Sequence, residues 1–505
     1  MAPFHTKLKN PIPTFLTLSI LLLFAPSSQS LWIDELYTGI AAKQKTFSDF
    51  YNFLISSPYA DIQKPLNLFI SWLWSQLFGH SELSLRFPNA LWIILSLIPI
   101  IRLSQRKSLY WLPYLYALHP FVWYYINESR PYALQIALGA WWLTLFIDWW
   151  DDHYRKKAQF YLYISTTLLS LTSLLAFFPI AVGWLIIFSK NIKNRAQRKQ
   201  TLFSLTYLIL ALAPSSLIYL YSFATGHQGG ARLWPVNFYN YLFAIYEFIG
   251  LQGFGPARDE LRQYMRSGLF TAVQHSLHYF VPIFCYLLII LRVFCKVITT
   301  EIKNHSIFLA FRKYLHLILY LSLPCVTLGI AAYLVSWPFW GRHLAISFPP
   351  FIYLTGLFVH KYYQYIKKKF SISIFLFVVA LVYSSFELRF DARHQKEDYK
   401  NSAILASDYA GDLSKTIWWV ASPLAIDYYE IHTYANIHPI YNIQNLDQLK
   451  SIIAKTGKPD FIFLSKPDVF DPNQIIQDFI NQYNYTLQPA VMKGFKIYSK
   501  PYSQH

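Results

Sequence analysis

The sequence has 505 residues, of which 54% are hydrophobic and only 14% are charged, and its mean hydropathy is positive. This composition excludes an ordinary soluble protein of this length and indicates a polytopic membrane protein. The net charge of +18 does not indicate a nucleic-acid-binding protein, because the basic residues form short clusters between apolar runs, as topology signals do. The three cysteines lie in or beside apolar segments and indicate neither a disulfide framework nor a thiolate metal site.

Eleven apolar runs predict membrane-spanning helices, because each approaches the roughly 20 residues that cross a bilayer. They lie near residues 12–30, 83–101, 108–126, 132–150, 158–176, 177–189, 201–221, 269–291, 314–336, 344–360 and 371–386. The fifth and sixth runs are continuous and form either a helical hairpin that turns near residues 177–179 or one long helix. The expected fold class is therefore an α-helical polytopic membrane protein.

The distribution of Lys and Arg predicts the orientation of the chain. If the N-terminus is cytoplasmic, the short inner segments contain 22 of these residues and the longer outer loops contain nine. This bias predicts a cytoplasmic N-terminus and an extracytoplasmic C-terminal part, and only the hairpin alternative for residues 158–189 preserves it. The first run ends in Ala25-Pro-Ser-Ser-Gln-Ser, which is compatible with a cleaved signal peptide as well as with the retained helix that we favour.

Two predicted outer loops are long, at residues 31–81 and 222–268. Residues 65–78 of the first loop are apolar but too short to span a bilayer, so we interpret them as an interfacial helix that lies along the membrane. The alternative, a distorted spanning helix, would break the alternation of charge. The second loop combines glycines with interspersed charges, which suits either a mobile loop that closes over a substrate or a plain connector.

From about residue 387 the composition becomes that of a soluble protein, so we expect a membrane domain at residues 1–386 and an extracytoplasmic α/β domain at residues 387–505. Its predicted strands lie near 416–421, 437–443, 459–464 and 494–499, and its predicted helices near 396–410, 446–456 and 473–483. The domain has no glycine-rich phosphate-binding loop, so we assign it no nucleotide.

Local capping signals support two of these helices. Asn445 precedes the helix at 446–456 and Gly457 follows it, which predicts an N-cap and a terminating glycine. Asp471 followed by Pro472 predicts a cap and a proline at the first position of the next helix.

Two adjacent acids, Asp34 and Glu35, follow the first apolar run in the segment Leu-Trp-Ile-Asp-Glu-Leu. In the predicted topology they share the outer face with Asp61-Ile-Gln-Lys64 and with Tyr124-Tyr-Ile-Asn-Glu-Ser-Arg-Pro-Tyr132. A pair of solvated interfacial acids is the simpler interpretation. The company of these motifs on the same face instead favours the hypothesis that the acid pair belongs to one water-filled site.

These motifs together resemble the GT-C superfamily of membrane glycosyltransferases, in the branch of the protein O-mannosyltransferases and the lipid A aminoarabinose transferase. The resemblance rests on the acid pair, the Pro-Leu segment that ends Leu77-Phe-Gly79, then Ser81-Glu-Leu-Ser-Leu-Arg-Phe-Pro88, then Glu128-x-Arg-Pro-Tyr132. It covers residues 30–190 well and the remaining spans in outline. Relatives often have His-Pro-Pro-Leu where this chain has Gln63-Lys-Pro-Leu66, so no ligand role of that histidine is transferred.

The resemblance implies a sugar donor on polyprenyl phosphate, a hydroxyl acceptor on a lipid, glycan or protein, contact with membrane lipids, and no nucleic-acid partner. A hydroxyl becomes a competent nucleophile if a positioned base takes its proton as it attacks, and a carboxylate partly shielded from water suits that task. By this analogy Asp34 is expected to be the base, and Glu35 to position it or the acceptor. The expected reaction inverts the anomeric carbon on the outer face of a bacterial inner membrane.

The leaving group is then a lipid phosphate, which needs cations rather than a general acid. Guanidinium groups bind phosphate through paired hydrogen bonds, so Arg130 and Arg342 are the candidates. Each has a simpler alternative, because Arg130 could form a structural bridge with Glu128 and Arg342 could extend to lipid headgroups. The other substrate-binding candidates are Asp61, Lys64, Glu128, Tyr132, His227 and His343. His227 could contact the acceptor or a metal, and a divalent metal cofactor is left open.

Two other classes of membrane protein compete with this interpretation. A secondary transporter usually has acids in the middle of its spans, whereas no Asp or Glu lies in the interior of a predicted span here. A catalytically inactive scaffold or sensor with an extracytoplasmic domain is not distinguished by the sequence. Loss of activity without loss of folding on Asp34→Asn would separate the enzyme from the scaffold.

Overall fold

The structure of the protein is a computed structural model, which describes residues 11–56, 60–151, 155–193, 198–226, 238–258, 260–261, 269–304, 307–337, 339–366, 371–441, 443–489 and 492–501. The chain divides into two compact units. The first contains Met1–Ser27, Tyr51–Ile70 and Arg86–His394, and the second contains Ser28–Phe50, Ser71–Leu85 and Gln395–His505.

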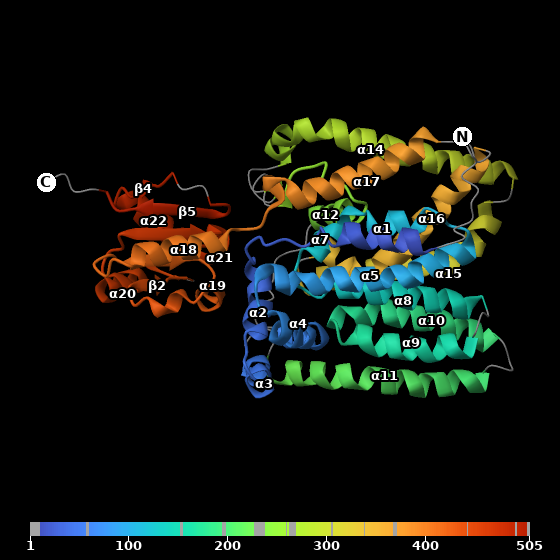
Figure 1. The fold of residues 1–505 in the computed structure, drawn as a ribbon, viewed down its shortest axis with the longest axis horizontal. Coiled ribbons are helices and arrows are strands. Elements are labelled where there is room, and N and C mark those ends of the chain that lie inside the picture. The colour runs from blue at the N-terminus through green and yellow to red at the C-terminus, as the bar shows by residue number, and fades with distance from the viewer. Residues whose placement is uncertain are drawn as a thin grey trace. The chain divides into compact units, whose positions relative to one another are not determined.

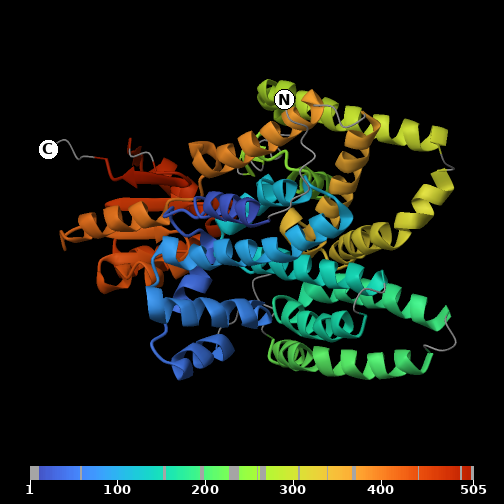
Figure 2. The ribbon, with the colours of Figure 1, turned by 45° about the vertical axis from the view of Figure 1, so that its right-hand side comes forward.

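The first unit consists of helices. They are α1 (Ile12–Leu22), α5 (Glu82–Lys107), α6 (Leu112–Ala117), α7 (Pro120–Ile126), α8 (Tyr132–Trp150), α9 (Arg155–Ser170), η2 (Leu174–Ala176), α10 (Phe177–Lys193), α11 (Arg198–Ala224), α12 (Phe238–Phe248), α14 (Leu269–Asn304), α15 (Ile307–Leu334), η4 (Gly341–Ser347), α16 (Phe348–Tyr365), α17 (Ile372–Phe390) and η5 (Ala392–His394). Of these, α5, α8, α9, α10 and α11 run roughly along a common direction (Figures 1 and 2). Before α5, the chain forms α3 (Phe47–Ser56), η1 (Ala60–Gln63) and α4 (Pro65–Phe78). Residues 65–78 are therefore helical, as both alternatives for this segment require.

Seven segments of the described chain are long and apolar enough to cross a membrane, so the protein is an integral membrane protein. They are Glu82–Lys107, Leu174–Ile192, Phe203–Ala224, Gln274–Lys303, Tyr314–Leu334, Gly341–Tyr365 and Ile372–Phe390. The predicted number of eleven is not confirmed. The first run forms a helix of only 11 residues, and the third is divided into α6 and α7, where Pro120 begins a new helix and the His119 side chain caps it.

The continuous apolar run at residues 158–189 forms two helices, as the hairpin alternative requires. α9 ends at Ser170 and α10 begins at Phe177. The chain changes direction at residues 171–176, earlier than the predicted turn at 177–179. The reason is local, because the Ser173 hydroxyl accepts a hydrogen bond from the backbone N of Leu175 and caps η2, which leads directly into α10.

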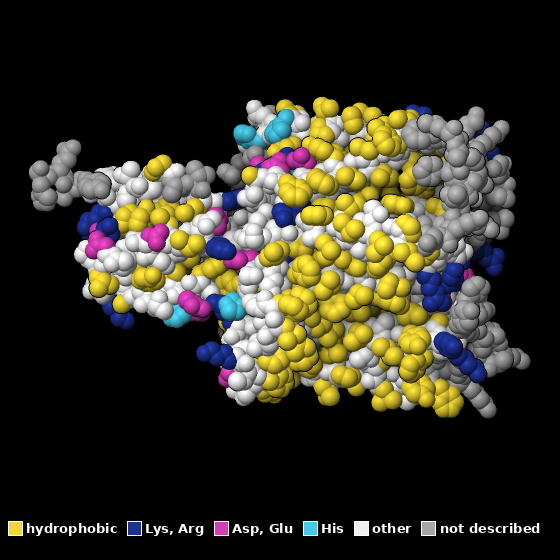
Figure 3. Space-filling view, viewed as in Figure 1, with side chains coloured by type: hydrophobic (Ala, Val, Ile, Leu, Met, Phe, Trp, Pro, Cys, Tyr) yellow, Lys and Arg dark blue, Asp and Glu magenta, His cyan; other side chains and the backbone are white. Residues whose placement is uncertain are grey.

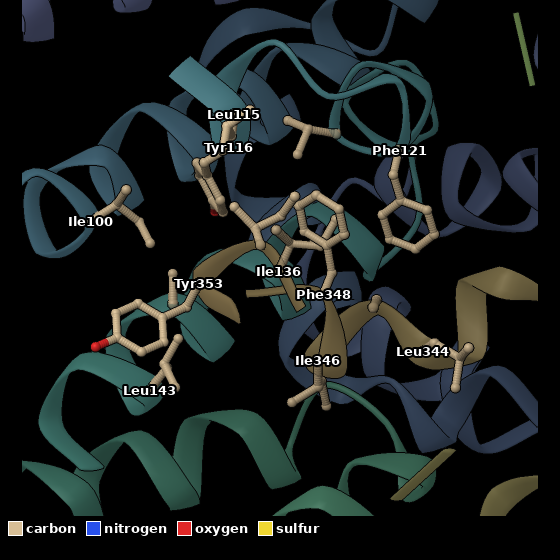
Figure 4. Packing of buried hydrophobic residues seen from close by; sticks show 14 of the residues in the cluster. Ile100, Leu115, Tyr116, Phe121, Ile136, Leu143, Leu344, Ile346, Phe348 and Tyr353 are labelled. Atoms are coloured by element: carbon tan, nitrogen blue, oxygen red, sulfur yellow. The ribbon is translucent and has the colours of Figure 1, made fainter. Parts of the chain in front are cut away.

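The core of the first unit is a dense layer of aromatic and aliphatic side chains from α6, α7, α8 and α16 (Figure 4). Phe121 stacks on Phe348 with ring centres 4.9 Å apart and an angle of 16° between the planes. A Cβ on Gly139 of α8 would lie 3.1 Å from the carbonyl oxygen of Ile346, so η4 packs directly on α8. This contact fixes the end of η4 beside α8.

The outer surface of the first unit is broadly apolar (Figure 3). On α11 and α14, Phe203, Leu217, Val281 and Phe284 are 60% to 69% exposed. Such a surface would promote aggregation in water, whereas in a bilayer it contacts lipid chains that are as apolar as itself. These helices therefore present the lipid-facing side of the unit.

The second unit contains a five-stranded sheet in the order β2-β1-β3-β5-β4 (Figure 1). Its strands are β1 (Ile417–Val420), β2 (Ile437–Pro439), β3 (Phe461–Ser465), β4 (Thr486–Leu487) and β5 (Phe495–Ser499). β1 pairs in parallel with β2 and β3, whereas β5 is antiparallel to β3 and β4. The four predicted strands are confirmed, and β4 was missed because a strand of two residues has no recognisable alternation.

Helices cover the sheet of the second unit. They are α18 (Tyr399–Ala410), α19 (Pro423–Tyr428), η6 (Ile431–Thr433), α20 (Leu446–Thr456), α21 (Pro467–Phe470) and α22 (Ile475–Gln482). α2 (Ile33–Ala42) belongs to the same unit and packs against α19. Leu36 shares one hydrophobic core with Tyr428, and a Cβ on Gly39 would lie 2.5 Å from the Tyr428 ring. This close approach explains why glycine occupies position 39.

The cap at Asp471 is formed differently from the prediction. The helix begins at Ile475, and the Asp471 carboxylate accepts hydrogen bonds from the backbone N of Ile476 at 3.1 Å and of Gln477 at 3.0 Å. Pro472 therefore lies before the helix and not at its first position. The side chain spans the intervening residues and satisfies donors of the first turn that have no partner within the helix.

Asn445→Ala is expected to lower the free energy of unfolding by about 1 kcal/mol. Its Oδ1 accepts a hydrogen bond from Gln448 N at 3.0 Å, and Gly457 at the other end has φ +78°, so both predicted caps of α20 are confirmed. Denaturant unfolding of the purified protein measures the loss. The matched control is Lys450→Ala, because its ion pair with Asp447 is exposed and is expected to contribute less than about 0.5 kcal/mol. Equal losses in both variants would contradict the cap.

Candidate functional site

The acid pair lies in the first turn of α2, in the second unit. Glu35 is fully buried, and its Oε2 accepts hydrogen bonds from the backbone N of Trp32 at 3.4 Å and from Lys396 Nζ at 3.0 Å. Asp34 is half-buried. The positive end of the helix dipole favours both carboxylates in this turn. The pair thus combines one acid that is neutralised and held in place with one that keeps access to solvent.

A second lysine of the same unit approaches the tryptophan that precedes the acids. Lys396 Nζ and Lys466 Nζ lie 5.7 Å and 5.3 Å from the centre of the Trp32 ring. Lys466 also binds the buried Glu397 through Oε1 at 2.5 Å. Its backbone has φ +40°, in the left-handed region that is unfavourable for a residue with a Cβ.

In the first unit, the carboxylate of Glu247 organises a second polar cluster. Glu247 is fully buried at the end of α12. Its Oε1 accepts hydrogen bonds from Arg258 Nη2 at 2.6 Å and from Gln252 Nε2 at 2.8 Å, and its Oε2 accepts one from Gly341 N at 2.8 Å. A Cβ at position 341 would lie 2.6 Å from Glu247 Oε2, so only glycine allows this approach. One buried acid therefore connects α12, the segment after it and the beginning of η4.

Aromatic rings surround the guanidinium of Arg258. Its Cζ lies 5.5 Å from the centre of the Tyr124 ring and 5.7 Å from those of Phe243 and Trp340. Burial alone would lower the pKa of Arg258, but Tyr124 and Glu247 more than offset it and raise this pKa well above its ordinary value. The arginine therefore remains charged in a largely apolar setting, stabilised by one carboxylate and by ring faces.

Two of the predicted substrate-binding residues lie together at the beginning of η4 and α8. Arg342 Cζ lies 5.9 Å from the centre of the Tyr132 ring. His343 accepts a hydrogen bond from Trp340 N through Nδ1 at 3.1 Å, and its ring centre lies 4.2 Å from that of Trp337. His343 therefore holds the turn that begins η4, while Arg342 extends beside Tyr132.

The segment between α7 and α8 contains the predicted residues Glu128 and Arg130, which are both buried. Asn89 Nδ2 donates to the carbonyl oxygen of Glu128 at 2.6 Å, and the backbone N of Arg130 donates to that same oxygen at 2.6 Å. The charge of Glu128 is also among those that raise the pKa of Arg258. The tight backbone of this segment places Glu128 within electrostatic reach of the Glu247 cluster.

Asp61 belongs to η1, and Lys64 immediately precedes α4. His227 lies outside the described residues. Among the residues that the structure describes, no group of three or more His, Cys, Asp or Glu side chains is arranged to hold a metal ion.

The sequence did not single out Glu247, Gln252, Lys396 or Lys466. One signal was present for Glu247, because it is the single acid of the apolar helix Phe238–Phe248. An acid in such a setting is usually buried with a partner. The lysines gave no signal, because basic residues are common on the surface of a soluble domain.

No protein-family model matches the chain, and no curated protein matches it significantly. Among solved structures, ArnT from Cupriavidus metallidurans bound to undecaprenyl phosphate matches with 12% identity and a TM-score of 0.50, over 97% of each chain. The Archaeoglobus fulgidus oligosaccharyltransferase in complex with Zn and sulfate also matches with 12% identity and a TM-score of 0.50, over 97% of this chain and 73% of that one. At these identities the likeness establishes the fold. The expected resemblance to the lipid A aminoarabinose transferase is therefore confirmed for the fold alone.

Proposed function

We propose that the protein transfers a sugar from a polyprenyl-phosphate donor to a hydroxyl group of a lipid, glycan or protein at the outer face of the membrane. The observation that carries this proposal is the acid pair of α2, in which Glu35 is buried against Lys396 and Asp34 stays partly accessible. The fold supports it, because ArnT shares this fold and was solved with undecaprenyl phosphate. The apolar surface of the first unit gives a polyprenyl chain access to the protein from the bilayer.

In the proposed reaction Asp34 is the general base. Its carboxylate takes the proton of the acceptor hydroxyl while the hydroxyl oxygen forms a bond to the anomeric carbon. The bond from that carbon to the phosphate oxygen breaks, and the polyprenyl phosphate leaves with the electron pair. A single displacement of this kind inverts the anomeric carbon. Glu35, held by Lys396 and by the first turn of α2, positions Asp34.

The leaving phosphate is proposed to bind to arginine. Arg342 is the first candidate, because it is half-buried beside Tyr132 and follows a turn that Glu247 and His343 fix. Arg130 is the second candidate. Guanidinium groups suit this role because they stay charged and bind two phosphate oxygens at once. Lys64 is proposed to assist at the phosphate, and Asp61 and His227 at the acceptor.

The topology completes the proposal. We infer that the N-terminus is cytoplasmic and that residues 387–505 lie outside, in a bacterial inner membrane, because the predicted inner segments contain 22 Lys and Arg residues and the predicted outer loops nine.

The test is sugar transfer by the purified protein in lipid nanodiscs. Undecaprenyl phosphate carrying glucose, galactose, mannose, N-acetylglucosamine or aminoarabinose serves as donor, and a membrane extract as the source of acceptor. We expect release of undecaprenyl phosphate from at least one donor. Arg342→Met is expected to raise the KM for that donor about tenfold or more, since a charged hydrogen bond to phosphate is lost.

The control is Arg102→Met, because Arg102 is 53% exposed and its partner Asp148 keeps Arg106. Its KM is expected to equal that of the wild type. If no donor is consumed while the protein moves any of these sugars across liposomes, the chain is a transporter and the proposal is wrong. Equal KM values for all three proteins would remove Arg342 from the phosphate site and leave the reaction class standing.

A further inference from the structure

A cluster of basic side chains in the first unit surrounds the C-terminal end of α8, which the proposed mechanism does not use. Lys107 Nζ binds Asp151 Oδ2 at 2.6 Å, and Lys190 Nζ donates to the carbonyl oxygen of Trp150 at 2.5 Å. Because Trp150 and Asp151 are adjacent, one ammonium group from α5 and one from α10 meet at the end of α8. The negative end of the helix dipole favours cations at this position.

Aromatic rings complete the cluster. Lys190 Nζ lies 4.4 Å from the centre of the Trp150 ring and 5.3 Å from that of Trp149. The His316 ring stacks on Trp150 with ring centres 4.1 Å apart and an angle of 7° between the planes. His316 also lies within electrostatic reach of both Lys107 and Lys190. The two lysines are therefore held around the same pair of rings and belong to one site. Tryptophan is typical of the depth at which lipid headgroups lie.

The carboxylates of the cluster are shared between cations. Arg102 and Arg106 both pair with Asp148, which is 2% exposed, so these arginines neutralise a buried acid. Asp151 pairs with Lys107 and also lies 3.8 Å from Arg106. Two carboxylates thus face three cations of α5. The Lys107 side chain is 31% exposed, and its ammonium group has three donors, so it can bind a further anion beside Asp151.

The sequence around the cluster is strongly basic, and the surface beside it is apolar. Residues 102–107, 148–157 and 190–199 contain 11 Lys and Arg residues and three Asp residues. On α5, Leu95 and Ile98 are 46% and 47% exposed, and Figure 3 shows Lys and Arg side chains beside the apolar surface at this end of the unit. A ligand that joins an anionic phosphate to apolar chains complements both features, whereas a soluble phosphate complements only the charge.

The cluster lies far from the proposed site of the donor phosphate. α8 has 19 residues, so its ends lie about 28 Å apart. Tyr132, beside Arg342, begins this helix, and the cluster surrounds its other end. The separation approaches the roughly 30 Å thickness of the hydrocarbon core, which places the cluster near the headgroups of the opposite leaflet. We propose that Lys107 and Lys190 bind the phosphate headgroup of an anionic phospholipid in that leaflet, as basic pockets between membrane helices do.

The test is native mass spectrometry of the purified, delipidated protein titrated with dioleoyl phosphatidylglycerol or dioleoyl phosphatidylcholine. Each lysine near a headgroup contributes about fivefold in affinity, so we expect the wild type to bind the anionic lipid about 20-fold more tightly than the zwitterionic one. Lys107→Gln/Lys190→Gln is expected to bind both lipids alike. Lys107→Gln alone should retain about a fivefold preference, and it replaces the double variant if that variant does not fold. A wild type without preference would overturn the inference.

The matched control is Lys296→Gln/Lys303→Gln. It removes two exposed lysines from α14, which packs against α16 and α17, and it changes the net charge of the protein by the same amount. This variant is expected to keep the wild-type preference for phosphatidylglycerol. If both double variants lose the preference to the same extent, general surface charge attracts the lipid and the inference is overturned.

A soluble competitor separates the lipid from its phosphate. Glycerophosphoglycerol is the headgroup of phosphatidylglycerol without acyl chains, and we expect it to leave the bound lipid in place when both are present at equal concentration. Displacement under these conditions would show that the cluster binds a soluble phosphate ester, and the lipid would be the wrong occupant. Since none of these measurements involves sugar transfer, their outcome is independent of the proposed function.

Discussion

Asp34→Asn is expected to lower kcat for sugar transfer by about 10²- to 10⁴-fold, because the acceptor hydroxyl then has no base to take its proton. The amide keeps the shape of the carboxylate, and Asp34 is only half-buried, so the fold should be unaffected. The measurement is single-turnover release of undecaprenyl phosphate, which isolates the chemical step from product release. The KM for the donor is expected to change little, because the base contacts the acceptor rather than the phosphate.

Two variants make this result specific. Asp49→Asn changes another acid of the second unit, one that caps α3 through Thr46, and it should transfer sugar at the wild-type rate. If Glu35 only positions the base, Glu35→Gln should lower kcat for sugar transfer less than Asp34→Asn does. Equal turnover by Asp34→Asn and the wild type would remove Asp34 as the base and retain the reaction class. If Glu35→Gln lowers kcat more than Asp34→Asn at unchanged stability, Glu35 is the base and Asp34 the positioning residue.

Glu247→Ala is expected to lower the free energy of unfolding by about 3–5 kcal/mol, because it leaves the guanidinium of Arg258 buried without its carboxylate. Gln252 Nε2 and Gly341 N lose an acceptor at the same time. Denaturant unfolding in detergent, followed by tryptophan fluorescence, measures this loss. Because Glu247 also fixes the turn before Arg342, the KM for the donor is expected to rise at temperatures where the variant stays folded.

A double variant and a surface variant complete the experiment. Glu247→Gln/Arg258→Met removes both charges and should recover much of the stability, since neither a buried carboxylate nor a buried guanidinium is left unpaired. Glu430→Ala breaks the ion pair with Lys43 at 2.7 Å, but Glu430 is 67% exposed and the loss should stay below about 1 kcal/mol. A Glu247→Ala variant as stable as Glu430→Ala would show that the cluster is dispensable for folding.

The sequence predicted best those elements that one short segment determines by itself. α20 begins and ends where Asn445 and Gly457 predicted, because both caps act within the helix that they bound. The division of the third apolar run was missed, because a hydropathy window averages over the single turn at which His119 caps and Pro120 begins α7. A helix break needs only two residues, whereas the apolar signal is spread over about 20.

The polar clusters could not be predicted in the same way. Glu35 and Lys396 are 361 residues apart, and Glu247 and Gly341 are 94 residues apart, so no local periodicity relates them. The acids themselves were found because they follow an apolar run within a recognisable series of motifs. Their neutralising partners depend on the pairing of distant segments, which hydropathy and capping signals do not report.

The second unit is built from segments that lie far apart in the sequence, so its folding can be completed only late in synthesis. α2 packs on α19, yet the ribosome makes the membrane helices of the first unit between them. At roughly 5–20 residues per second, the wait between residue 50 and residue 395 is on the order of tens of seconds. During this interval Leu36 and Gly39 lack the surface that will cover them, and Glu35 lacks Lys396. A chain interrupted after its last membrane helix would therefore be inserted in the bilayer without a finished acid pair, so only full-length chains could become active.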